Sequence, residues 1–225
     1  MSQLAAIFVV IAAALSPSLN AAESVSVLRA KVLDAARTLL DTTEVSYVYG
    51  GRALGSGPDC DTCNQCLAAK SPGPKERFAN CPECTRCSLD CSHFTQLVYE
   101  KAGLKVPYLT TALMAELGPE ALTRDYHMVA AGDAATAAQP GDLLVYNGHV
   151  VILESVGALG FGDVIHATSG LELKGPGMGI QRVRHAQLAN FRGPLLRVLR
   201  HVKLAGPVPS APKQSRIPHL RPIKP

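Results

Sequence analysis

One cysteine of the chain, Cys91, has the local sequence of a nucleophile. In "LDCSHF" it directly follows Asp90, a residue type that favours the position before a helix, and apolar residues follow at helical spacing. The first turn of a helix presents free N–H groups and a positive partial charge, which favour a thiolate and can stabilise an oxyanion. We therefore expect Cys91 to be a catalytic thiol with a lowered pKa.

A thiol nucleophile needs a base, and two histidines further along the chain are suitable. His149 follows an Asn-Gly pair in "NGHVVIL", and His166 lies in "VIHAT". Asn-Gly between apolar runs predicts a hairpin, and adjacent strands can bring the two rings together. The sequence thus predicts His149 as the general base and His166 as the group that orients its ring. The other histidines, His127, His185, His201 and His219, are expected at the surface or in the tail.

The remaining cysteines form two triplets, "CDTCNQC" and "CPECTRC", which share a spacing of two intervening residues. Six cysteines beside one reactive thiol suit three disulfides in an oxidising compartment. The mirror symmetry of the triplets predicts nested pairs: Cys60–Cys87, Cys63–Cys84 and Cys66–Cys81.

Zinc is the alternative for this segment. Cys63, Cys66, Cys81 and Cys84 have the spacing of a four-thiolate structural site, which would make zinc a structural cofactor. Cys81, Cys84, Cys87 and Cys91 also have ferredoxin-like spacing, but Ser92 stands where that motif has proline. Disulfides are preferred, no metal is favoured, and no cofactor is expected for catalysis.

The elements around these residues indicate an α+β fold. Periodic apolar residues predict helices over 24–43, 89–103 and 111–118. Alternating or continuous apolar runs predict strands over 140–146, 149–156, 163–170, 179–185 and 194–204. We expect the N-terminal helices to pack on an antiparallel β-meander. The cysteine triplets lie within an insertion over 53–88, whose stretch 68–80 reads as a loop.

The ends of the chain differ from its centre. Residues 1–22 contain an apolar run too short to span a bilayer, which indicates a signal peptide and an exported, periplasmic or secreted protein without a transmembrane segment after cleavage. Residues 205–225 are rich in proline and basic residues, which predicts a disordered tail. The net charge of +4 comes with no interleaving of aromatic and basic residues, so nucleic acid is not an expected partner. We expect a monomer.

Four motifs together resemble the NlpC/P60 cysteine peptidases: "YVYGG", "LDCSHF", "QPGDLLVY" leading into "GHVVIL", and "VIHATSG". The resemblance covers about residues 24–204, apart from the insertion. It implies a papain-like catalytic domain over 23–204, with Cys91 as nucleophile, His149 as base and His166 as the third polar residue. It also implies that Tyr47, Asp90 and Ser92 line the substrate site.

The substrate that this resemblance implies is the stem peptide of peptidoglycan, cut between γ-D-glutamyl and a diamino acid. The chain departs from the family in the long span between Tyr47 and Cys91 and in His93, where many members have glycine. We expect the insertion to form a wall or lid that restricts entry to the site. Alternatives on the same scaffold are an amidase, a transpeptidase or an antibacterial toxin, and one of another class is a catalytically silent cell-wall binding module.

Overall fold

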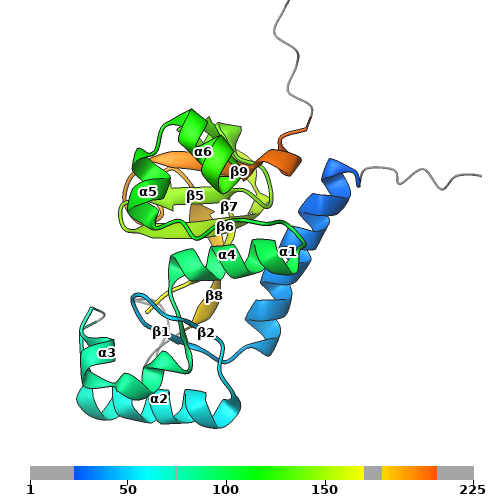
Figure 1. Cartoon of the computed structure of the whole chain (residues 1–225). Helices are drawn as coiled ribbons and strands as arrows, with labels where there is room; N and C mark the ends of the chain where they lie inside the picture. The colour runs from blue at the N-terminus through cyan, green and yellow to red at the C-terminus, as the bar shows by residue number, and fades with distance from the viewer. Residues whose placement is uncertain (1–22, 74, 170–178, 207–225) are drawn as a thin grey trace, which may run out of the picture.

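The computed structural model describes residues 23–73, 75–169 and 179–206. These residues form a mixed α+β fold, as expected from the sequence (Figure 1). The predicted signal peptide, 1–22, and the predicted tail beyond residue 206 lie outside the described residues. Within the described part of the chain, no helix has the length and apolarity needed to cross a membrane.

The first helix, α1 (Val25–Thr42), supports the core along its whole length. Ser24 is its N-cap, since the Ser24 side chain accepts a hydrogen bond from the N–H of Val27. The buried positions follow helical spacing: Leu28, Val32, Ala35, Ala36 and Leu39. One apolar face is therefore available to pack on the sheet and on the helix that carries Cys91.

The main sheet has six antiparallel strands in the order β4-β9-β5-β6-β7-β8. Their bounds are β4 Met128–Gly132, β5 Leu143–Tyr146, β6 His149–Val156, β7 Phe161–Ala167, β8 Ile180–Gln187 and β9 Arg197–His201. Strands β5 to β8 form the expected meander. The expectation of a simple meander is wrong for β9, which returns to lie beside β5.

The composition of β9 explains why it lies inside the sheet. Leu199 packs in the cluster on the helix side of the sheet, and Val198 packs in the cluster on the opposite side. A strand with apolar residues on both faces is stabilised by an interior position. β8 exposes Arg184 and His185, so it suits an edge.

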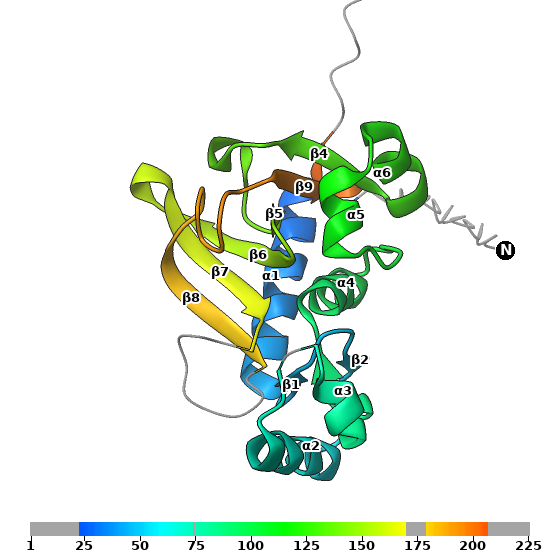
Figure 2. The same ribbon diagram turned by 90° about the vertical axis from the view of Figure 1, so that its left-hand side faces the viewer.

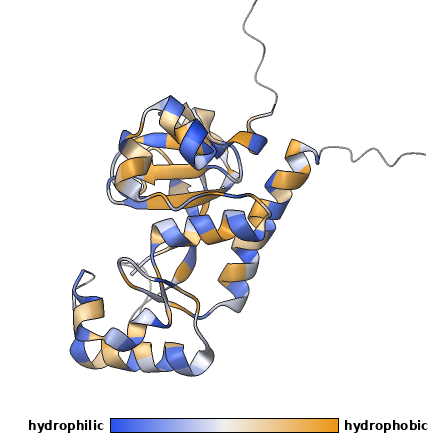
Figure 3. Cartoon of the chain, in the orientation of Figure 1, coloured by the Kyte–Doolittle hydropathy of each residue, from blue (hydrophilic) through white to orange (hydrophobic). Residues whose placement is uncertain are grey.

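The sheet separates two apolar layers. On one face α1 and α4 (Cys91–Lys101) pack against it, and Figures 1 and 2 show both helices beside the same sheet. On the other face, Leu188 packs with Val151 and Val164, and Phe191 and Leu195 pack against them. Figure 3 shows β5 and β6 as largely hydrophobic, as expected for strands covered on both faces.

Two short helices and several single turns complete the main body. α5 (Thr111–Glu116) confirms the third predicted helix, whereas α6 (Pro119–Tyr126) was not predicted. The 3₁₀ turns are η2 (Ala135–Ala137), η3 (Ala158–Gly160) and η4 (Val202–Leu204). His201 is buried between β9 and η4, where its Nδ1 accepts the N–H of Lys203, so its expected surface position is wrong.

A second, three-stranded sheet connects the main body to the cysteine-rich segment. β3 (Ser88–Leu89) pairs in parallel with β1 (Ser46–Tyr47) and antiparallel with β2 (Arg52–Ala53). Gly51 lies between β1 and β2, where an added Cβ would come within 2.8 Å of the Leu89 amide nitrogen. Only glycine allows this approach, which holds the strand of Tyr47 beside the segment that leads to Cys91.

The cysteine-rich segment folds as a small helical module at the end of the molecule away from the main sheet (Figures 1 and 2). It contains α2 (Gly57–Lys70), α3 (Arg77–Asn80) and η1 (Pro82–Thr85), so the predicted loop over 68–80 is partly helical. The nested disulfides are confirmed: Cys60–Cys87, Cys63–Cys84 and Cys66–Cys81. They join α2 to the chain that returns toward β3.

Candidate active site

Cys91 is the first residue of α4, as the sequence predicts, and Asp90 is its N-cap. Asp90 Oδ1 accepts the N–H of His93 at 2.7 Å, and Oδ2 accepts the N–H of Gly50 at 3.1 Å. The Asp90 carboxylate thus satisfies a donor of the first helical turn and fixes the turn after Tyr47. One carboxylate holds the helix start and the Tyr47 strand in one arrangement.

The thiol of Cys91 is enclosed, with a residue exposure of 4%. The backbone N–H groups of Val150 and Ser92 and the hydroxyl of Tyr47 lie where they would stabilise a thiolate. Burial raises the pKa of Cys91 to about 11, with the negative charge of Asp90 as a second cause; the three donors oppose this shift. The expected lowering of the pKa is therefore wrong, because desolvation and a neighbouring charge outweigh the helix terminus.

His149 and His166 meet as predicted. His149 Nε2 lies 2.7 Å from His166 Nδ1, and the rings are close to perpendicular. Burial lowers the pKa of His149 to about 3, with the cation of Arg192 as a further cause. The pKa of His166 is also well below its ordinary value, through burial, His149 and Arg192. The two rings therefore form a neutral, hydrogen-bonded pair at neutral pH.

The thiol approaches the sheet at the beginning of β6. The β6–β7 register pairs Ile152 with Ile165 at this end, and the N–H of Val150 is placed to stabilise a Cys91 thiolate. Val150 belongs to the helix-side cluster, and His149, the first residue of β6, directly precedes it in the chain. Within the described residues, no hydrogen bond joins Cys91 to His149, so the resting site contains a neutral thiol and a neutral imidazole.

The cysteine-rich module contacts β1, the strand that contains Tyr47. The Ser46 hydroxyl donates to Asn64 Oδ1 of α2 at 2.5 Å, and the Arg77 guanidinium donates to the carbonyl of Tyr47. Val48 packs among Cys63, Cys81 and Cys84. The module thus contacts the segment that carries Tyr47, and Cys60 and Cys87 pack in the same core cluster as Cys91. The expected lid stays a prediction.

An aromatic pair that sequence reasoning missed lies beside the N-cap. The rings of His93 and Tyr108 stack with centroids 4.0 Å apart, and His93 Nδ1 lies 3.0 Å from Asp90 Oδ1. The Ser92 hydroxyl donates to Asp90 Oδ1 and lies 3.2 Å from the Tyr108 hydroxyl. Although burial alone would raise it, the pKa of Asp90 is lowered because His93 and Ser92 donate to its carboxylate. His93 and Tyr108 are among the residues that line a groove of about 370 Å³.

Nothing in the sequence indicated that Phe191 and Arg192, which follow β8 in the chain, would lie near the site. The rings of Phe191 and His166 meet edge to face, with their centroids 5.4 Å apart. Arg192 Nη2 donates to the hydroxyl of Thr168 at 3.0 Å. No spacing pattern links the segment "NFRGP" to residues more than twenty positions earlier. Only the return of the chain over the sheet brings it to the histidine pair.

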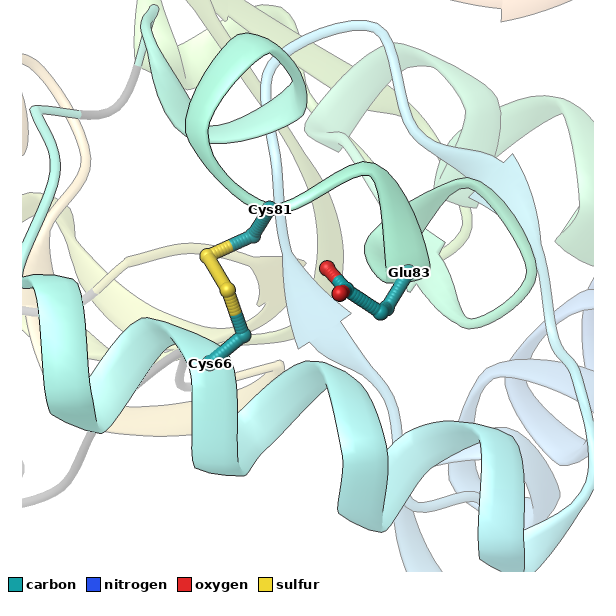
Figure 4. Close-up of side chains that lie close together, drawn as sticks. All are labelled: Cys66, Cys81 and Glu83. Atoms are coloured by element: carbon teal, nitrogen blue, oxygen red, sulfur yellow. A yellow bond between two sulfur atoms is a disulfide. The ribbon is translucent and has the colours of Figure 1, made fainter.

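Cys66, Cys81 and Glu83 form a further close group, in which their ligand atoms lie within 4.8 Å of one another (Figure 4). The two sulfurs are joined in a disulfide, and so are Cys63 and Cys84. None of the four cysteines of the alternative zinc site therefore offers a thiolate to a metal in this structure. The oxidised module is held by covalent bonds.

No protein-family model matches the chain, and no curated protein matches it significantly.

Proposed function

We propose that the chain is an exported cysteine hydrolase with a papain-like fold of the NlpC/P60 type. Its substrate would be the stem peptide of peptidoglycan, cut between γ-D-glutamyl and a diamino acid. The observation that carries the proposal is the 2.7 Å bond between His149 Nε2 and His166 Nδ1, which leaves His149 Nδ1 for a proton from Cys91. A cysteine at the first position of α4 and an oriented imidazole at the beginning of β6 are the two groups that thiol hydrolysis requires.

The proposed reaction proceeds in two steps. His149 Nδ1 takes the thiol proton as the sulfur of Cys91 attacks the carbonyl carbon, and the oxyanion is stabilised by first-turn N–H groups and the Tyr47 hydroxyl. The proton passes to the leaving amine, the C–N bond breaks, and a thioester remains. Water then gives a proton to His149 and attacks the thioester, which releases the carboxylic acid and restores the thiol.

The resting protonation states are compatible with this course. Thiol and imidazole are both neutral, so the proton must move during attack rather than before it. Tyr47, Asp90 and Ser92 surround the nucleophile and are the proposed substrate-binding residues. The disulfides are compatible with an oxidising compartment, and the basic residues beyond 206 would favour contact with an anionic wall polymer.

Digestion of purified peptidoglycan tests the proposal. Wild-type protein, Cys91→Ala and a control, His185→Gln at an exposed edge position, are incubated with the polymer, and the soluble fragments are analysed by mass spectrometry. We expect wild type and the control to release fragments cut after γ-D-glutamate, and Cys91→Ala to release none. Whole stems freed from the sugar would indicate an amidase, new cross-links a transpeptidase, and no Cys91-dependent product a binding module.

A further inference from the structure

Cys66–Cys81 is the most accessible of the three disulfides in the cysteine-rich module. Cys66 is half-buried, whereas the other five bonded cysteines are buried. The Cα atoms of this pair lie 5.8 Å apart, compared with 5.0 Å and 4.6 Å in the two other pairs. A reducing thiolate must reach a sulfur atom to open a disulfide, so a dithiol opens this pair before the two that are enclosed.

The carboxylate of Glu83 lies beside this disulfide. One of its oxygens and the two sulfurs lie within 4.8 Å of one another, and Figure 4 shows the carboxylate turned toward the sulfurs. Oε2 of Glu83 is buried without a hydrogen-bond partner in the described part of the chain. Because a buried acceptor without a donor costs about 1–3 kcal/mol, a cation bound at this oxygen would recover part of that cost.

The positions of these three atoms suit one zinc ion once the disulfide is open. Zinc binds thiolate sulfur at about 2.3 Å and carboxylate oxygen at about 2.0–2.2 Å, so two ligands of a tetrahedral ion lie about 3.5–3.8 Å apart. The two sulfurs must separate by about 1.7 Å from their bonded distance, which rotation of the two side chains allows. The Glu83 oxygen needs to move by roughly an ångström at most.

The chemistry of the ligands and the charges around them also favour zinc. Two thiolates and one carboxylate suit zinc, whereas calcium and magnesium prefer oxygen ligands alone. Lys70 Nζ donates to the carbonyl of Asn80 at 2.6 Å, which places an ammonium group beside the residue that precedes Cys81. This positive charge offsets part of the negative charge of the three ligands and favours the thiolates over the thiols.

We propose that reduction of Cys66–Cys81 turns this end of the module into a zinc site, with Cys66 Sγ, Cys81 Sγ and a Glu83 oxygen as protein ligands and water as the fourth. A dithiol supplies two electrons and two protons, the S–S bond breaks, and the dithiol becomes a disulfide. Zinc then displaces the two thiol protons to solvent. The metal keeps α2 joined to η1 when the covalent link is open. The site is independent of the proposed hydrolase function.

Metal binding by the Cys91→Ala protein tests the inference, because this background lacks the free thiol of the candidate active site. The protein is treated with dithiothreitol until alkylation and mass spectrometry find Cys66 and Cys81 free and the other two disulfides intact. The reductant is removed and Zn²⁺ is added. Native mass spectrometry should find one zinc per chain in the reduced protein and none in the untreated protein. Co²⁺ in place of zinc should give the charge-transfer absorption of two thiolate ligands.

Two further variants in this background test Glu83 as a ligand. Because changing even an outer partner of a metal ligand costs tenfold or more in affinity, Glu83→Gln should weaken zinc binding by at least about tenfold. Glu76→Gln, at an exposed position of the same module, should leave the Kd for zinc unchanged. Equal affinity in Glu83→Gln and its parent would overturn the inference, as would a reduced protein that binds no zinc while its other two disulfides are intact. Zinc bound only after Cys63–Cys84 has also opened would indicate the four-thiolate site instead.

Discussion

Asp90 caps the helix that begins at Cys91, and its charge adds to burial in raising the pKa of the adjacent thiol. The carboxylate accepts the N–H of His93 at 2.7 Å, and the same negative charge is the second cause, after burial, of the raised pKa of Cys91. The Asp90 side chain thus stabilises the beginning of the helix but reduces the fraction of Cys91 that is ionised. The Cys91 thiol is therefore neutral at neutral pH.

The rate of thiol alkylation should report the raised pKa of Cys91 and the part that Asp90 has in it. With a pKa of about 11, about one Cys91 thiol in ten thousand is ionised at pH 7, so iodoacetamide should react slowly and faster with each unit of rising pH. Asp90→Asn keeps a capping side chain and removes the charge, so its alkylation at pH 8 should be several-fold faster. Tyr47→Phe removes a donor to the thiolate and should be slower. A slower reaction in Asp90→Asn would contradict the charge effect.

The buried histidine pair should make the fold sensitive to acid. The folded-state pKa of His149 is lowered to about 3 from an ordinary 6.5. The stability that neutral His149 contributes to the fold is therefore complete above pH 6.5 and is lost as pH falls through about 3. Between pH 7 and pH 4.5 we expect the free energy of unfolding to fall by about 2.5 kcal/mol through His149. Urea denaturation at both pH values measures this fall. His149→Gln should reduce it, and exposed His185→Gln should not.

The buried Asp142 should be a strong determinant of stability. It accepts hydrogen bonds from Arg29 Nη1 at 3.1 Å and Arg200 Nη2 at 2.7 Å, and so joins α1 to β9. Asp142→Ala leaves two partly buried cations without their partner and should cost about 3–5 kcal/mol in chemical denaturation. Asp125→Ala removes the exposed partner of Arg124 and should change little. Equal effects of the two substitutions would show that burial of the Asp142 group is not what matters.

The disulfides should differ in their effect on activity. Cys87 directly precedes β3, which leads to Cys91, whereas Cys66–Cys81 is remote from that strand. We expect Cys60→Ser/Cys87→Ser to lose both stability, about 2–4 kcal/mol, and peptide cleavage, and Cys66→Ser/Cys81→Ser to retain most cleavage. Mass spectrometry after alkylation checks the starting state: one modified cysteine in denaturant without reductant, and seven after reduction.

Local patterns in the sequence determine much of this molecule. Apolar periodicity places α1 and α4, Asp90 marks the beginning of α4, Asn147-Gly148 predicts the β5–β6 hairpin, and the mirrored cysteine spacing predicts the disulfide pairs. Each of these signals depends on residues close together in the chain, where geometry is constrained by the backbone itself. The pairing of His149 with His166 is of this kind, since neighbouring strands carry them.

Other properties were decided only by the tertiary structure. The pKa of Cys91 moves opposite to the expectation from a helix end because burial removes water from the sulfur and the negative charge of Asp90 lies beside it. The position of β9 beside β5, the cover of His166 by Phe191, and the register that opposes Gln181 to His166 all depend on contacts between distant segments. Burial and charge act through space, so the chemistry of the thiol and of the imidazoles follows from the fold and not from spacing along the chain.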